Sequence, residues 1–66
     1  MIDVAMKYNV VTKRGAWFDI VDIETGEVLE GNIQGQANVI EFLENENNVA
    51  VLQRVENLID AKMQEA

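Results

Sequence analysis

The side chains that could carry chemistry in this chain are mostly carboxylates. Twelve Asp and Glu residues stand against five Lys and Arg residues, and the sequence contains no His, Cys or Ser. His is the commonest general base, and Cys and Ser are common nucleophiles, so the usual groups for acid–base and covalent catalysis are missing. Neither Thr12 nor Thr25 has an apparent base beside it, and no G-x-x-x-x-G-K-[ST] phosphate loop occurs. We therefore expect no catalytic site and no bound cofactor in this chain.

Four of the carboxylates cluster around one predicted β-turn, and they are Asp19, Asp22, Glu24 and Glu27. A hard cation such as Ca²⁺ needs about six to eight oxygen ligands that converge on one point. The spacing of an extended strand spreads these side chains apart, and no EF-hand pattern is present. We interpret the cluster as a solvated strand edge and turn, where charge also discourages edge-to-edge aggregation, and we expect no metal site.

The only adjacent pair of basic residues is Lys13-Arg14, directly before Gly15. This pair, with Lys7 earlier in the chain, could contact phosphates, or it could be a few solvated charges at a corner between two elements. A formal net charge of −7 argues against a stand-alone nucleic-acid binder, because affinity for phosphates comes largely from Lys and Arg that release counterions. A local basic patch is still compatible with that sum, because the field at a site depends on arrangement. Any such binding should be weak and salt-dependent.

Two aromatic residues, Trp17 and Phe42, could serve as stacking platforms for nucleic-acid bases. Both lie in apolar periodic segments, where aromatic side chains usually fill a core. We therefore interpret both as core residues.

Length and composition limit the architecture. A chain of 66 residues makes one domain at most, and it buries only about 60% of the surface that its unfolded state exposes, so the core is thin. The hydrophobic content of 48% is ordinary for a globular domain. No apolar run approaches the roughly 20 residues of a membrane span, and no signal-peptide pattern opens the chain. We expect a cytoplasmic protein.

The apolar pattern predicts a helix, a β-hairpin and two further helices, which together make a small α+β domain. The first helix lies within residues 1–12, where Ile2, Met6 and Val10 fall on one face. The β-branched residues that follow favour its end before Lys13.

The hairpin is predicted over residues 16–33, with a tight turn in which Gly26 takes a positive φ. Alternation in its first strand is imperfect, so either both faces are partly covered or a bulge shifts the register. A helix pair is predicted over residues 35–64, and Asn47 or Asn48 can cap the last helix. We expect the pair to cover one face of the hairpin, with this core: Phe42, Leu52, Val55 and Ile59 against Trp17 or Phe18, Ile20 and Leu29. The polar side of the last helix is predicted to carry Arg54, Glu56, Asn57 and Asp60.

Two segments, KRGAWFDI and GQANVIEFLENENNVAVLQRVENLI, resemble the C-terminal domain of RecA-type recombinases in their order and spacing. The matching residues are Gly15-Ala16-Trp17-Phe18, Gly35-Gln36-Ala37-Asn38, Phe42-Leu43 and the turn from Asn45 to Asn48. The resemblance extends from about Ile2 to Leu58, and the opening segment resembles the helix that joins the family's ATPase core to this domain.

The chain also departs from the family pattern. Gln36 and Glu44 stand where bacterial members commonly carry Lys, and Asn47 is not followed by the usual Pro. The hairpin is longer than in the bacterial proteins, which suggests a diverged member, for which a phage-borne source is one interpretation.

The resemblance implies a role in DNA recombination and repair. In the family, the core uses ATP and Mg²⁺ and forms a filament on single-stranded DNA, and the C-terminal lobe admits duplex DNA. Lys13 matches the basic position that contacts incoming duplex, with Arg14 beside it and Lys7 as a further candidate. Gln36 and the amides that begin its helix lie at the other side of that gateway, where a helix N-terminus suits a phosphate. The implied partners are double-stranded DNA, weakly bound, and the rest of the recombinase chain and filament, with no membrane and no small-molecule substrate.

Two further expectations follow. A buried Trp17 should hold the Lys13-Arg14 pair in place. The alternative to DNA contact is an acidic regulatory or protein-interaction lobe, which would use these side chains: Glu41, Glu44, Glu46, Glu56 and Asp60. Those acids are more typical of an ordinary solvated helix face.

Overall fold

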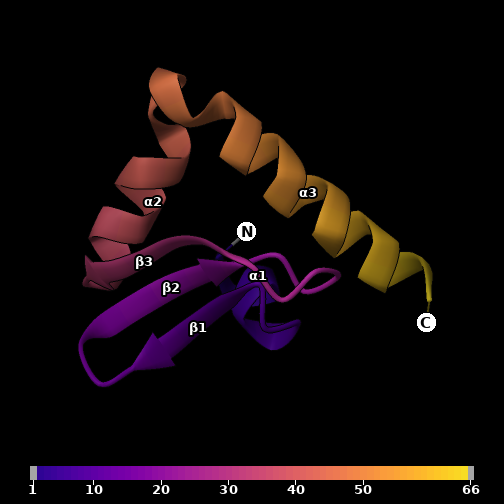
Figure 1. Ribbon diagram of the computed structural model, residues 1–66, viewed down its shortest axis with the longest axis horizontal. Coiled ribbons are helices and arrows are strands. Elements are labelled where there is room, and N and C mark those ends of the chain that lie inside the picture. Colours follow the sequence, from indigo (N-terminus) through magenta and orange to yellow (C-terminus); the bar gives the residue numbers. More distant parts are fainter. Residues whose placement is uncertain (1, 66) are drawn as a thin grey trace.

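The computed structural model describes residues 2–65, so Met1 and Ala66, at the ends of the predicted domain, lie outside the described part. In chain order the elements are α1 (Ile2–Lys7), β1 (Val11–Arg14), β2 (Trp17–Val21), β3 (Val28–Gln34), α2 (Gln36–Glu44), η1 (Glu46–Asn48) and α3 (Val49–Gln64). The strands form one antiparallel sheet in the order β1-β2-β3. Figure 1 shows a helix, a sheet and then helices, which confirms the predicted α+β class.

The sheet has one strand more than the predicted hairpin. Helix α1 ends at Lys7 instead of continuing toward residue 12, and Asn9 adopts a left-handed φ of 66° that turns the chain. The β-branched residues Val11 and Thr12 then begin β1, where Val11 pairs with Ile20. The β-branched run therefore starts a strand, and the helix ends before that run begins.

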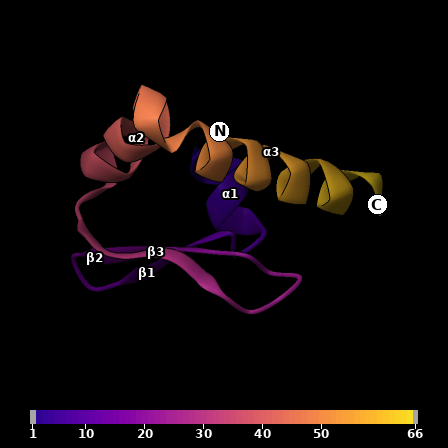
Figure 2. The same cartoon turned by 45° about the horizontal axis from the view of Figure 1, so that its top comes forward.

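All three α-helices lie on one side of the sheet, and its other face is left open (Figure 2). The buried core on the helix side consists of Ala5, Val10, Val11, Phe18, Ile20, Val39, Leu43, Val55, Leu58 and Ile59. Phe42 is partly buried against this core. Trp17, by contrast, is 44% exposed, whereas Phe18 is 4% exposed. The prediction of a core Trp17 is wrong, because side chains along a strand alternate and Phe18 occupies the covered face.

A bulge in β3 accounts for the imperfect alternation that the sequence shows in the hairpin. The register shifts between Phe18 and Ile20, where β3 carries one residue more than β2. Asn32 in the bulge has a φ of 58°, and Gly31 beside it leaves room for Asp19. A Cβ at Gly31 would lie 3.2 Å from an Asp19 carboxylate oxygen, so a larger residue would press on that side chain.

The turn between α2 and α3 uses Asn side chains differently from the predicted cap. The Asn45 side chain accepts a hydrogen bond from the Asn47 amide at 2.8 Å and so caps η1. Asn48 occupies the N-cap position of α3, but its side chain donates to the Phe42 carbonyl at 2.9 Å. The predicted N-cap position at Asn48 is therefore confirmed, but its side chain does not cap the amides of α3. Among the described residues, no helix is long and apolar enough to cross a bilayer.

Candidate nucleic-acid interface

A two-residue turn, Gly15-Ala16, joins β1 to β2 and contacts the start of α2. Arg14 pairs with Trp17 across this turn. Gly15 has a φ of 62° at the first central position, where short hairpin turns favour glycine. The amide of Gly35, the residue before α2, donates to the Ala16 carbonyl at 3.0 Å. The hairpin turn and the N-terminus of α2 therefore form one continuous part of the surface.

Lys13 and Arg14 project from opposite faces of the sheet. They are consecutive in β1, and cross-strand partners share a face. Lys13 lies opposite buried Phe18, and Arg14 lies opposite exposed Trp17. The expectation that both cations act together at the rim of a buried indole is therefore wrong, because the indole and Arg14 share the open face.

Arg14 forms a two-point ion pair on that open face. Its Nε lies 2.8 Å from Asp19 Oδ2, and its Nη2 lies 3.0 Å from Asp19 Oδ1. The same Nη2 donates to the Asn32 side chain at 3.1 Å, and the Asn32 amide donates to Asp19 at 3.0 Å. These hydrogen bonds hold the pKa of Asp19 below its usual value, and those from Arg14 are the main cause. The charge of Arg14 is thus matched by a carboxylate before any ligand arrives.

Lys13 is exposed, and it forms no ion pair with any residue between 2 and 65. Lys7 is also exposed, and its ammonium lies 5.6 Å from the centre of the Tyr8 ring. The remaining cations, Arg54 and Lys62, are paired with acids. Within the described part of the chain, Lys13 and Lys7 are therefore the two cations without an acidic partner.

Helix α2 begins with backbone amides that no described side chain caps. Gly35 takes the N-cap position with a φ of 86°, and the first turn contains no acid. Gln36 is exposed at the first helical position. The Asn38 side chain instead donates to the Gln34 carbonyl at 2.6 Å. The positive end of the α2 dipole therefore has no competing carboxylate in its own first turn.

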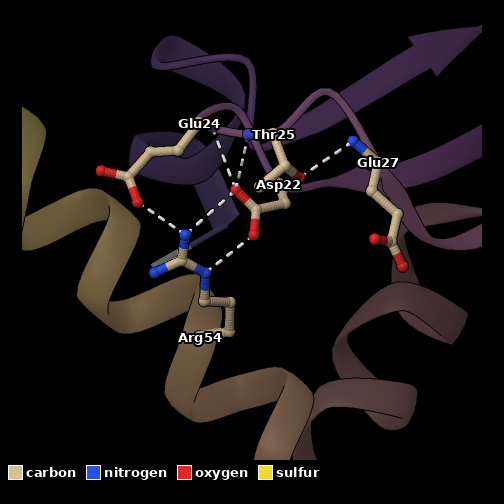
Figure 3. Close-up of polar contacts among 5 residues, drawn as sticks. All are labelled: Asp22, Glu24, Thr25, Glu27 and Arg54. Carbon is tan, nitrogen blue, oxygen red and sulfur yellow. Dashed lines mark hydrogen bonds and ion pairs between the residues drawn. The ribbon is translucent and has the colours of Figure 1, made fainter.

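A second polar cluster joins α3 to the turn after β2 (Figure 3). Arg54 donates to Asp22 through Nε at 2.8 Å and through Nη2 at 3.2 Å, and Nη2 also donates to Glu24 at 2.6 Å. Asp22 further accepts from the amides of Glu24 and Thr25 at 3.0 and 3.3 Å. Hydrogen bonding from Arg54 is the main cause that lowers the pKa of Asp22, although burial opposes it.

The structure corrects the sequence-based interpretation of this cluster. Asp22 is 7% exposed, not solvated, and Arg54 turns toward it from the side of α3 that was predicted to face water. The alternation of side chains along the strand could have indicated this burial. Asp22 falls on the same side as Phe18 and Ile20, which are both buried. Across residues 2–65, no three acidic side chains are grouped so that they could hold a metal ion.

Comparisons with known proteins agree with this architecture. Residues 1–64 match the family model of the RecA C-terminal domain. This chain belongs to that family. The RecA C-terminal domain described here is similar to Protein RecA of Clostridium perfringens strain 13 and of strain ATCC 13124, each 39% identical over 62 residues. No solved structure gives a significant match.

The aligned residues cover 94% of this RecA C-terminal domain but 15% of each of the two relatives. The family assignment confirms the resemblance on which the sequence-based prediction of function depends. The matched family model is that of the C-terminal domain.

Proposed function

We propose that this RecA C-terminal domain contacts double-stranded DNA and admits it to a recombinase filament through weak phosphate contacts. The observation that carries the proposal is the hydrogen bond from Gly35 to Ala16, which joins the hairpin turn beside Lys13 to the uncapped start of α2. Cationic side chains and free helix amides are both favourable partners for phosphate.

Lys13 lies across the sheet from the start of α2. Lys13 pairs with Phe18, and Phe18 pairs with Ile33 just before α2. Two strand spacings therefore separate Lys13 from Ile33, roughly 10 Å across the sheet. We assign the phosphate contacts to Lys13 and to the start of α2 with Gln36, and we assign a secondary contact to Lys7. Arg14 can contact phosphate only after it leaves its ion pair with Asp19.

The physical chemistry also limits the affinity. A domain of net charge −7 with two unpaired cations in its described part should bind DNA weakly and without sequence preference. Repetition of the domain along a filament would multiply such contacts through effective concentration. ATP and Mg²⁺ would act in the core of a full recombinase, and the role agrees with a cytoplasmic location.

A titration of the ¹⁵N-labelled domain with duplex DNA at low salt tests the proposal. We expect amide shifts around Lys13 and around Gly35, and we expect Lys13→Glu to abolish them. Lys62→Glu is the matched control, since it reverses the same charge near the end of α3, where Lys62 already pairs with Glu65 at 3.2 Å. Shifts confined to another face, or equal loss in both variants, would contradict the assigned contacts.

The second candidate function is an acidic regulatory lobe that repels DNA or binds a basic partner. It is favoured by the pairing of three of the five cations and by the exposure of these acids: Glu41, Glu44, Glu46, Glu56 and Asp60. Reversal of both charges at Lys13-Arg14 in a recombinase that carries this domain separates the two functions. A DNA-contacting lobe then loses strand pairing, whereas a docking lobe keeps it.

A further inference from the structure

A groove of about 410 Å³ lies where α1, α2 and α3 meet. Its lining consists of Ile2, Ile40, Leu43, Glu44, Leu52 and Glu56. Leu43 is 1% exposed and belongs to the core, whereas Ile40 is 36% exposed, so the groove runs from the core to the surface. Its volume lies within the range of about 300–1,000 Å³ that is typical of ligand pockets.

The polar groups of this groove are both acidic. Glu44 of α2 and Glu56 of α3 line it, and none of the basic residues described between 2 and 65 does. Both side chains are exposed, and neither forms an ion pair with any residue between 2 and 65. The groove therefore combines an apolar lining with two carboxylates whose charge is not neutralised by a neighbour.

This charge excludes several occupants. Nucleic acid and anionic lipid surfaces are both negative and would be repelled by Glu44 and Glu56. A second copy of the domain is also unfavourable, because it would bring two more carboxylates to the groove and would join two bodies of net charge −7. The complementary occupant is apolar and positively charged.

We infer that the groove binds a short amphipathic segment of a partner protein, with apolar side chains in the groove and Lys or Arg residues beside Glu44 and Glu56. Binding of an amphipathic helix in an apolar groove uses apolar anchors that recur every three or four residues. Burial of those anchors against Ile40 and Leu52 would supply the affinity. The two carboxylates would favour a positively charged segment and determine its orientation. The groove shares no residue with the candidate DNA interface, so this inference stands apart from the proposed DNA contact. It shares Glu44 and Glu56 with the second candidate function and specifies the chemistry of its partner.

A synthetic peptide of about 14 residues, or four helical turns, is the probe, with Leu at helical spacing and Lys elsewhere. We expect its titration into the ¹⁵N-labelled domain to shift the amides of Ile40, Leu43 and Leu52. The double variant Glu44→Lys/Glu56→Lys should bind roughly tenfold more weakly, since two attractive charge pairs become repulsive. Glu27→Lys/Glu65→Lys is the matched control, because it changes the net charge equally at two exposed positions outside the groove and should retain most of the affinity.

Three further measurements complete the test. Ile40→Ala shortens an exposed side chain of the groove and leaves the buried core intact. It should weaken binding of the peptide, while the other amide signals remain those of the native fold. A peptide with Glu in place of Lys should not bind. Equal binding of that acidic peptide, equal loss in the two charge variants, or shifts on another face would overturn the inference. Shifts at Ile40 and Leu52 that depend on protein concentration without peptide would overturn it in favour of a second copy.

Discussion

Asp22 and Arg54, 32 residues apart in the chain, meet in a two-point ion pair that joins the end of β2 to α3. The Asp22 carboxylate also accepts the amides of Glu24 and Thr25, so one side chain both shapes the turn and attaches a helix to it. In a domain with so thin a core, such a link should matter for stability.

Replacement of Asp22 by Ala should lower the melting temperature by at least about 5 °C, because two turn amides and the Arg54 guanidinium lose their acceptor together. Thermal unfolding followed by circular dichroism measures this. Glu27→Ala removes an exposed acid from the same turn and should change the melting temperature little. An equal fall in both variants would show that the ion pair is not the cause.

The stability of the domain should fall in acid. The pKa values of Asp19 and Asp22 lie below the usual 3.8 in the folded protein, mainly through hydrogen bonds from Arg14 and Arg54 respectively. Their stabilising contribution is complete above the usual value and is lost as the pH falls through the lowered folded values. We expect urea midpoints to change little from about pH 7 to 5 and to fall below about pH 4. Asp22→Asn should flatten that fall, whereas Glu27→Gln should leave its slope as it is.

Adjacent aromatic residues should differ sharply in their effect on stability. Phe18→Ala should cost about 3–5 kcal/mol, comparable with the whole stability of a domain of this size, about 3–10 kcal/mol. Trp17→Ala should cost about 1 kcal/mol or less, because the indole is 44% exposed on the open face of the sheet. Urea unfolding measures both, and Phe18→Leu supplies a value if the Ala variant does not fold. Trp17 is the chain's single Trp, so strong quenching of its fluorescence by acrylamide would independently confirm its exposure.

Release of Arg14 should strengthen DNA binding if the proposed function is correct. Asp19→Asn removes the carboxylate that holds Arg14, and the freed guanidinium can add one phosphate contact. The affinity for duplex should rise, and the slope of log K against log salt should steepen by about 0.9. Asp60→Asn makes the same change of charge on the exposed side of α3. An identical gain in both variants would indicate a general charge effect and would speak against a contact at Arg14.

Much of the fold could be predicted from local patterns. The helices at 35–64 and the turn at Gly26 follow from apolar spacing and from backbone preference, which are properties of neighbouring residues. Residue motifs around Gly15 and Gly35 were likewise enough to indicate the RecA C-terminal domain family, which the family match confirms. Lys7 and Lys13 could be named as candidate contacts from the sequence. That neither forms an ion pair within residues 2–65 could not be predicted, because ion pairing depends on where the acids lie in the fold.

The remaining features depend on contacts between distant segments. Residues 10–12 have β-branched side chains that weaken a helix anywhere, but Val11 and Thr12 join β1 because β2 offers backbone partners. Trp17 and Phe18 are both large and apolar, and only the side of the sheet that the helices cover determines which one is buried. Arg14 and Arg54 look equally free in the sequence, yet each lies beside a carboxylate in the folded chain. The sequence alone therefore determined the types of element and the family, because these reflect short-range preferences. Tertiary packing determined which faces are covered and which charges are paired, because burial and ion pairing depend on residues that are far apart in the chain.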